Sequence, residues 1–206
     1  EGAERIVHIV DGHFAAGDEV ELVVDEARRD AIRRNHSATH LAHWALRTVL
    51  GDHVKQAGSL VATDRLRFDF CHFQPVTADE MARVEDLVNA RVVANHEVGT
   101  RVSTYDAAVK DGVIAFFGEK YGDEVRVVQV SPESRELCGG THCRRSGDIG
   151  LFKIVSEEGI ASGVRRIEAV TGMGAVSFVR GLETTLKRAA NELKAAPAEI
   201  VERVTK

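Results

Sequence analysis

The sequence predicts an α+β fold, in which a mostly antiparallel sheet packs with helices and a helical extension follows at the C-terminal end. Short runs of alternating or β-branched residues recur between turn signals, longer stretches show the 3.6-residue apolar period of helices, and the chain contains no internal repeat. With 206 residues, the chain is long enough for one domain with a sizeable core, alone or with an appendage.

The composition excludes several classes of protein. Hydrophobic residues make up 44% and charged residues 29%, which excludes a disordered tail or a low-complexity linker. The 27 Lys and Arg against 32 Asp and Glu exclude a strongly basic nucleic-acid coat, although not a local basic patch. No apolar run approaches the length of a membrane span, and no signal peptide is visible. Three cysteines argue against a disulfide framework and predict a reducing, cytoplasmic setting.

The N-terminal end predicts two short strands, over 6–10 and 19–24, joined by a turn that contains glycine. Because two strands alone are marginally stable, we expect this pair to belong to a sheet or barrel whose beginning is missing here. The first residue is not Met, so the sequence could be a piece of a longer protein. Helical periodicity then runs from Asp25 to Leu50, where Gly51 is a typical stop signal.

The middle of the chain combines strands with one capped helix. Residues 56–62 indicate a turn entering a strand, and 65–72 alternate, with the Leu and Phe residues on one face and charged residues on the other. Thr77 and Glu80 have the spacing of a capping box, which predicts a helix that ends at about Asn95.

The second half predicts further strands and then helices. A strand over 98–104 comes first, followed by a short helical stretch up to Phe117 and a strand over 125–130. Residues 136–142 indicate a strand end with a tight loop, and two strands over 150–157 and 164–171 are joined by a turn over 158–163. Beyond Gly174 the pattern is that of a helix, which is broken at Pro197 before a last helical piece.

Two pairs of metal-binding side chains stand out. His36 and His40 form an HxxxH pair, whose two imidazoles share one face of a helix and could reach the same ion. Ser37 stands where a metalloprotease HExxH motif would have its glutamate. Cys138 and His142 form a CxxxH pair on a glycine-containing loop, and a thiolate with imidazoles suits zinc.

Each pair also has a simpler interpretation. The two histidines of the helix could be packed core or surface residues, and the cysteine could be a buried thiol beside a turn histidine. Together the pairs predict a zinc site with His36, His40, Cys138 and His142 as ligands. A four-ligand set does not need the other nearby candidates, so we expect Cys143 to be a bystander and His43 a supporting or packing residue. Cys71 lies in an alternating strand on the face opposite its phenylalanines, where we expect a packed or partly exposed thiol.

Six motifs in order resemble the editing domain of alanyl-tRNA synthetases. They are RNHSATHL at 34–41, QAGSLV at 56–61, RFDF at 67–70, ELCGGTH at 136–142, GDIG at 147–150 and GVRRIE at 163–168. The editing domain of threonyl-tRNA synthetases looks similar, but its second metal-binding half is more like CRGPH, so CGGTH favours the alanine branch.

The resemblance implies a zinc-dependent deacylase that hydrolyses the ester of tRNA for alanine wrongly charged with serine or glycine. A pocket built for alanine rejects an added hydroxyl only weakly and cannot exclude the smaller glycine by size, so a second, hydrolytic site is needed. The implied organisation is a remnant of an accessory β-barrel at 1–24, the editing domain at 25–172, and a helical linker to a C-terminal region at 173–206. Nothing in the chain resembles an ATP site, so the implied role is that of a fragment of the synthetase, with the remainder in cis.

Two residues are candidates for substrate contacts. Thr39 lies between the two histidines, and its hydroxyl could bond a serine side chain or position water; alternatively, it bonds its own helix backbone. Gln56 begins the second motif, and its amide could hold the ester or the attacking water; alternatively, it faces solvent. Four protein ligands normally close a zinc site, whereas a catalytic zinc keeps one position open. The zinc ion therefore either has one loose ligand, expands its coordination number to five, or mainly shapes the pocket.

Cationic contacts are expected for the acceptor end of a tRNA. Arginines also crowd the start of the first helix, although many such side chains are solvated or paired with acids. The candidates for tRNA contacts are Arg65, Arg67, Arg144, Arg145, Arg165 and Arg166. The apolar stripe of the C-terminal helix could support a homodimer. Two alternatives to a synthetase fragment stay open: a free-standing trans-editing deacylase of the same superfamily, and a non-catalytic, zinc-stabilised tRNA-binding module.

Overall fold

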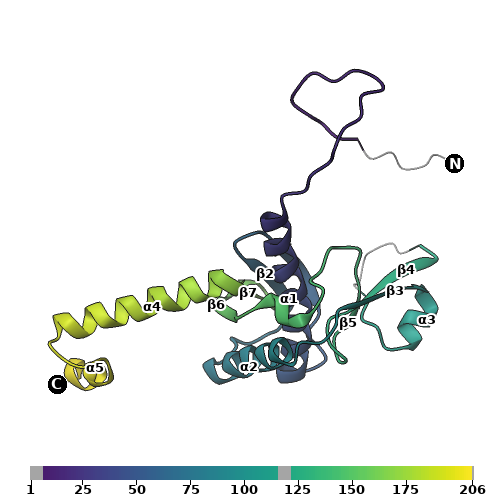
Figure 1. Cartoon of the computed structure of the whole chain (residues 1–206). Coiled ribbons are helices and arrows are strands. Elements are labelled where there is room, and N and C mark those ends of the chain that lie inside the picture. The colour runs from purple at the N-terminus through teal and green to yellow at the C-terminus, as the bar shows by residue number, and fades with distance from the viewer. Residues whose placement is uncertain (1–6, 116–121, 206) are drawn as a thin grey trace.

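The computed structural model describes residues 7–115 and 122–205, and it confirms the mixed α+β class (Figure 1). A four-stranded antiparallel sheet has the order β1-β2-β7-β6, and a three-stranded antiparallel sheet has the order β3-β4-β5. The strands are β1 (Gln56–Val61), β2 (Leu66–Cys71), β3 (Gly99–Thr104), β4 (Glu124–Gln129), β5 (Arg135–Leu137), β6 (Phe152–Ala161) and β7 (Val164–Thr171). The α-helices are α1 (Glu26–Leu50), α2 (Ala78–Ala94), α3 (Tyr105–Lys110), α4 (Gly172–Glu192) and α5 (Ile200–Val204), with short 3₁₀ turns η1 (Ser146–Ile149) and η2 (Pro197–Glu199).

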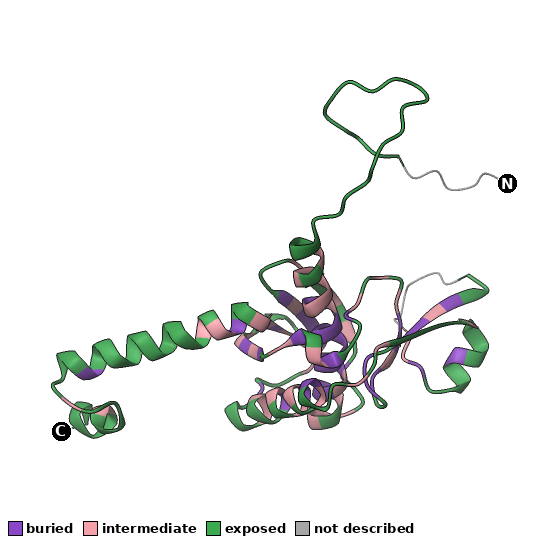
Figure 2. Cartoon of the chain, viewed as in Figure 1, coloured by how far each residue is buried: buried purple, intermediate pink, exposed green. Residues whose placement is uncertain are grey.

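Helix α1 has the predicted bounds because both of its ends are specified locally. The Asp25 side chain accepts a hydrogen bond from the Arg28 N–H at 2.9 Å, which caps the first turn. Gly51 ends the helix with a φ of 115°, a conformation that residues with side chains rarely adopt. The central turns of α1 are buried in the body of the domain, as Figure 2 shows.

The main core lies between α1, α2 and the four-stranded sheet. Leu66, Phe68 and Phe70 of β2 are fully buried in it, as the alternation of the sequence predicts. The predicted capping box of α2 is also present, since the Thr77 hydroxyl accepts from the Glu80 N–H and the Glu80 carboxylate accepts from the Thr77 N–H. A smaller core lies under the three-stranded sheet and consists of Ala108, Val113, Val125, Val127 and Leu137.

Three predicted elements differ from the structure. Residues 7–24 form neither helix nor strand and are exposed, because no strand in the described part of the chain pairs with them. The predicted turn over 158–163 is shorter, since strand pairing extends to Ala161 and Gly163, with a φ of 70°, turns the chain at once into β7. The helical stretch predicted up to Phe117 ends at Lys110, and Phe117 itself lies outside the described residues.

Helix α4 leaves the body of the domain as a projecting arm (Figures 1 and 2). Of its 21 residues only Ala175 and Ala190 are buried, and its apolar stripe, which includes Leu182 and Leu186, is largely exposed. The predicted break at Pro197 is the 3₁₀ turn η2. Across 7–115 and 122–205, none of the helices combines the length and the apolar character that crossing a membrane requires.

Candidate metal centre

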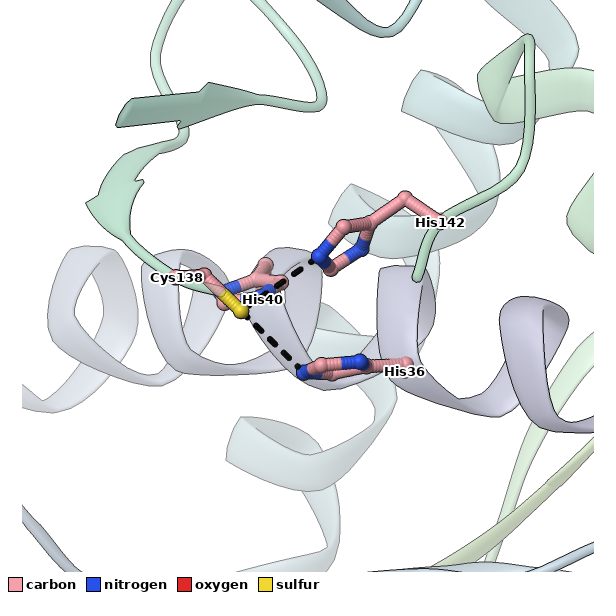
Figure 3. A group of neighbouring side chains, drawn as sticks. All are labelled: His36, His40, Cys138 and His142. Atoms are coloured by element: carbon pink, nitrogen blue, oxygen red, sulfur yellow. Dashed lines mark hydrogen bonds between the residues drawn. The ribbon is translucent and has the colours of Figure 1, made fainter. Parts of the chain in front are cut away.

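Two segments 102 positions apart in the sequence meet at one point of the structure (Figure 3). His36 and His40 lie one turn apart on α1, and Cys138 and His142 lie on the loop that follows β5. Each of the four offers one ligand atom, and these atoms all lie within 4.8 Å of one another. Cys138 Sγ is 3.4 Å from Nε2 of His36 and 3.4 Å from Nε2 of His142. The structure therefore brings together the four residues predicted as ligands, and the group could hold a metal ion.

The donor set fits a metal ion by geometry and by hydrogen bonding. The 3.4 Å separations of sulfur and nitrogen are close to the roughly 3.5 Å that Zn–S and Zn–N bonds of about 2.3 and 2.0–2.1 Å give at a tetrahedral angle. His40 Nε2 is buried and has no hydrogen-bond partner in the described ranges, although a buried nitrogen normally has one. A side chain at Gly140 would collide with the His36 ring, because its Cβ would lie 2.6 Å from Nδ1.

The ligand loop is held in place by its neighbours on both sides. Arg126 of β4 donates to two loop carbonyls, that of Cys138 at 3.1 Å and that of Gly140 at 2.6 Å. On the other side, the buried Ser37 hydroxyl accepts from the Cys143 N–H at 3.0 Å. These contacts join the loop to β4 and to α1 and so support the positions of both ligand pairs.

Glu136 lies directly beneath the candidate metal centre. Its side chain is 2% exposed, and its carboxylate accepts one hydrogen bond from Nδ1 of His40 at 2.5 Å and another from Nδ1 of His43 at 2.8 Å. His43 is therefore a supporting residue of the site, as expected, and is connected to the proposed ligand His40 through Glu136.

The titratable groups of the site form one coupled set. Burial raises the pKa of the Cys138 thiol, but hydrogen bonds from His142 and His36, together with the adjacent His40, outweigh burial and lower its pKa to about 3. Burial likewise raises the pKa of Glu136, but His40 and His43 lower its pKa to about 2. Burial lowers the pKa of His40, but the adjacent Glu136 carboxylate outweighs it and raises the pKa to about 10. In the metal-free chain a thiolate and a carboxylate therefore flank His40 and stabilise its protonated form.

Thr39, a predicted substrate contact, is 4% exposed and makes a local hydrogen bond. Its hydroxyl donates to the Asn35 carbonyl at 2.8 Å, one helical turn earlier, which is the simpler of the two interpretations of this residue. The hydroxyl oxygen keeps lone pairs that could accept a further hydrogen bond.

Gln56, the other predicted substrate contact, lines a cavity of about 230 Å³. The cavity lies between α1, the start of β1 and the segment before β4, and its other lining residues are His43, Arg47, Val54, Lys55, Ile114 and Ala115. Gln56 is half-buried, and its amide nitrogen lies 3.4 Å from the Ser59 hydroxyl. His43 thus belongs both to the wall of this cavity and to the hydrogen-bonded support of the metal centre.

The six arginines predicted to contact tRNA differ in how far they are already paired. Arg166 makes two hydrogen bonds to Asp69, at 2.7 and 2.8 Å, and Arg165 makes one to Glu157 at 2.6 Å. Arg65 pairs with Asp64 at 3.0 Å and Glu168 at 3.7 Å, and Arg67 lies 3.7 Å from Asp69. Arg145 donates to the Asn95 carbonyl. Arg144 is exposed and has no ion pair with any described residue.

A second, larger cavity of about 700 Å³ adjoins the ligand loop beside Arg144. It is lined by Val24, Glu26, Arg29, Asp30, Arg33, Arg34, Cys143, Arg144 and Asp148. The arginines at the start of α1 and Arg144 therefore share one surface, and the acids among them balance part of its charge. Cys143 is buried there, and burial raises the pKa of its thiol to about 11, so it stays protonated as expected for a bystander.

Two supporting residues, Glu136 and Arg126, go beyond what the sequence analysis identified. Glu136 carried a usable signal, because it is two residues before Cys138 at the end of a predicted strand and thus on the same face. Arg126 carried none, because its contact with the loop depends on the register between β4 and the chain after β5.

The fold and the site together define the class of this protein: an α+β domain in which a histidine pair on a helix faces a Cys-Gly-Gly-Thr-His loop. Residues 125–168 match the family described as "Threonyl and Alanyl tRNA synthetase second additional domain". This match includes β4, β5, the ligand loop and most of the β6–β7 hairpin.

Longer similarity identifies the branch. The chain is 59% identical over 198 residues, 96% of its length, to an alanine–tRNA ligase of Myxococcus xanthus (strain DK1622), and 56% identical over 193 residues, 94% of its length, to one of Burkholderia thailandensis. Over 94–96% of its length the chain thus matches part of alanine–tRNA ligases, as its motifs predict. It spans 22% of the length of these curated relatives.

Proposed function

We propose that this chain is the editing part of an alanyl-tRNA synthetase and hydrolyses the ester of alanine tRNA wrongly charged with serine or glycine. The observation that carries this proposal is the convergence of His36, His40, Cys138 and His142 in a chain with this sequence similarity. In the reaction, water adds to the ester carbonyl carbon, and the bond to the ribose oxygen breaks to release the amino acid and the tRNA.

Zinc is the proposed cofactor, and these four residues are its proposed ligands. When bound, a zinc ion would supply Lewis-acid chemistry beside the ester. One thiolate and three imidazoles are a ligand set that zinc prefers. Three of the four ligand residues are half-buried and not fully enclosed, which supports access from solvent to the centre. All three cysteines are free thiols, in agreement with the proposed reducing, cytoplasmic setting.

The other steps fall to residues of the chain itself. Gln56 is proposed to hold the ester or the attacking water by its amide, since it is half-buried in a cavity that shares His43 with the metal centre. Thr39 is proposed to accept or position a polar group of the substrate, because its hydroxyl donates to Asn35 but keeps acceptor capacity. The 230 Å³ cavity is small, which suits the side chain of a small amino acid.

The proposed partners are alanine tRNA and the remainder of the synthetase in cis. Arg144, with Arg145 beside it, is the strongest candidate for a phosphate contact, because it has no ion pair in the described residues and adjoins the ligand loop. Arg65, Arg67, Arg165 and Arg166 already have acidic partners, so a contact with tRNA would have to compete with these pairs or share them.

Deacylation of seryl-tRNA and alanyl-tRNA, both made on alanine tRNA, tests the proposed activity with the chain as it stands. We expect fast loss of serine while alanine is spared, and glycyl-tRNA should be hydrolysed as well. A variant with Cys138→Ser is the internal control, because it removes one proposed ligand. Equal hydrolysis by the variant and the wild type would contradict a role of the metal centre, and equal rates for serine and alanine would contradict editing.

The alternatives predict different results. A purely structural zinc in a tRNA-binding module should unfold the domain when a chelator removes it, with no deacylation before or after. An editing site should lose deacylation while circular dichroism shows a largely retained fold, as the loop contacts of Arg126 and Ser37 support. A free-standing trans-editing enzyme would share the chemistry, but the similarity over 94–96% of the chain is to alanine–tRNA ligases.

A further inference from the structure

Glu136 connects the candidate metal centre with the cavity that contains Gln56. Its Oε2 accepts from His40, a proposed ligand, and its Oε1 accepts from His43, a residue of the cavity wall. All three side chains are at most 5% exposed, so no solvent competes for these bonds. A buried carboxylate is costly unless its oxygens are satisfied, and here each oxygen has one imidazole.

The two hydrogen bonds determine which nitrogen of each ring carries a proton. An ionised carboxylate can only accept, so Nδ1 of His40 and Nδ1 of His43 must both donate. His40 must lose a proton to bind a metal ion, and with Nδ1 donating to Glu136 its lone pair then lies on Nε2, the buried nitrogen that has no hydrogen-bond partner in the described ranges. This is the tautomer that binds a metal ion through Nε2, and a carboxylate on the opposite nitrogen also makes the imidazole a stronger ligand.

We propose that Glu136 is the positioning residue of the metal centre, and that His43 acts through it by holding the second carboxylate oxygen. The metal centre and one wall of the Gln56 cavity are in this way held by a single side chain. His43, which has no ligand role, is therefore expected to influence metal affinity through Glu136.

Glu136→Gln tests the first half of this inference, because it preserves the shape of the side chain. Its amide NH₂ cannot accept from a ring N–H, so one histidine must change its tautomer or lose its bond. We expect Zn²⁺ affinity, measured by competition with a chromophoric chelator, to fall about 10–100-fold. The absorption spectrum of the Co²⁺-loaded chain should change as well, because it reports the geometry around the ion. Glu133→Gln is the matched control: it is three residues away and paired with Arg91, and it should change neither readout.

A pair of substitutions at His43 tests the second half. His43→Leu removes the donor to Glu136 and should lower Zn²⁺ affinity, whereas His43→Asn offers an N–H near the position of Nδ1 and should retain most of it. Combined with Glu136→Gln, His43→Leu should add little further loss, because both act through one carboxylate. If Glu136→Gln does not fold, as judged by circular dichroism, this pair still decides the proposal.

Because the inference rests on the metal-binding role proposed above, the wild type must bind Zn²⁺. Wild-type affinity and an unchanged Co²⁺ spectrum in Glu136→Gln would overturn the inference alone, as would equal affinities of His43→Leu and His43→Asn. Absence of Zn²⁺ binding by the wild type would overturn it together with the metal role. Deacylation is not a readout here, so failure of the proposed editing activity would be seen separately.

Discussion

Gln56 and Thr39, the two residues predicted to contact substrate, lie in different surroundings. Gln56 lines a cavity, and its side chain makes one hydrogen bond to a described residue, of 3.4 Å, so its amide can reorient toward a bound ester. Thr39 is nearly buried and is tied to its own helix at 2.8 Å. The two residues therefore differ in what a substitution would reveal: Gln56 should affect the reaction, whereas Thr39 should affect both the reaction and the packing of α1.

Gln56→Ala should lower kcat/KM for seryl-tRNA deacylation by about 10²–10³-fold, the usual effect of losing a donor that stabilises a developing oxyanion. Zinc content should stay at the wild-type level, because Gln56 does not contact the four proposed ligands. Parallel kinetics and metal analysis check both expectations. Gln129→Ala, on an exposed position of β4, is the control, and a Gln56 variant as fast as this control would remove Gln56 from the site.

The metal-free chain should show a pH dependence of stability that the coupled site determines. The pKa of Cys138 falls from 9.0 to about 3 on folding, so its contribution is present above 9.0 and lost as pH falls toward 3. The pKa of His40 rises from 6.5 to about 10, so its contribution is present below 6.5 and lost as pH rises toward 10. Stability should therefore rise between about pH 3 and 6.5, and change little between 6.5 and 9, where the two effects oppose each other.

Urea unfolding in the presence of a chelator, repeated at several pH values, measures this profile. In Cys138→Ser the opposing effect of the thiol is absent, so stability should decline between about pH 6.5 and 9 as the pH rises. A decline of the same size in the wild type would show that the thiol stays protonated in the folded, metal-free chain.

At the residue scale, the sequence was sufficient to identify the four converging side chains, because their spacing on a helix and on a glycine-containing loop is a local property. For Glu136 the sequence could indicate only the face of the strand, because its histidine partner His40 is 96 residues away, and Arg126 depends on strand register. Pairing of Arg165 and Arg166 with acids on neighbouring strands was invisible for the same reason.

At the scale of secondary structure, elements with local end signals were predicted well. Helices α1 and α2 have a capping aspartate and a capping box, and β2 has strict alternation on a half-buried sheet. Residues 7–24 have strand-like composition but no neighbouring strand in the described chain, so composition alone misled the prediction. The length of the β6–β7 hairpin depends on a glycine with positive φ, whose position in the turn the sequence left open.

Asn35 joins three elements that position the metal centre. Its side chain donates to the Ala62 carbonyl at 2.8 Å and accepts from the Thr171 hydroxyl at 2.7 Å, which links α1 with the β1–β2 turn and the end of β7. Asn35→Ala should lower the free energy of unfolding by about 1–3 kcal/mol, because buried partners are left unsatisfied. Denaturant unfolding checks this value. Asn191→Ala, on exposed α4, should stay within about 0.5 kcal/mol of wild type, and an equally small effect at position 35 would contradict the link.

At the scale of the whole molecule, the distribution of charge determines how tRNA can approach. Replacing Arg144 and Arg145 with Gln should weaken binding of alanine tRNA. The slope of log affinity against log salt concentration should also become less steep, by about 0.7–0.9 for each phosphate that is no longer neutralised by an arginine. Binding titrations at several salt concentrations measure this slope. The control is the variant with Arg180→Gln and Arg188→Gln on α4, which has the same net charge. Identical slopes in the two variants would show that the surface around Arg144 and Arg145 is not the phosphate-binding surface.

The exposed stripe of α4 predicts self-association of this chain. Leu182 and Leu186 lie one turn apart on the arm, and burying them against a second copy would remove apolar surface from water. Sedimentation velocity should show a concentration-dependent dimer that Leu182→Glu with Leu186→Glu abolishes. Arg180→Glu with Thr184→Glu, of the same spacing on the opposite side of the helix, should leave the dimer intact. A wild type that stays monomeric at all concentrations would contradict this prediction.

The separation of the two ligand pairs along the chain has a consequence for synthesis. A ribosome that adds about 5–20 residues per second needs roughly 5–20 s to pass from His36 to Cys138, 102 positions later. During that time the growing chain holds the histidine pair without Cys138 and His142, and the long loop between the two pairs must close before the centre exists. Metal capture is therefore expected to be a late event in the maturation of this domain, and to report that its folding is complete.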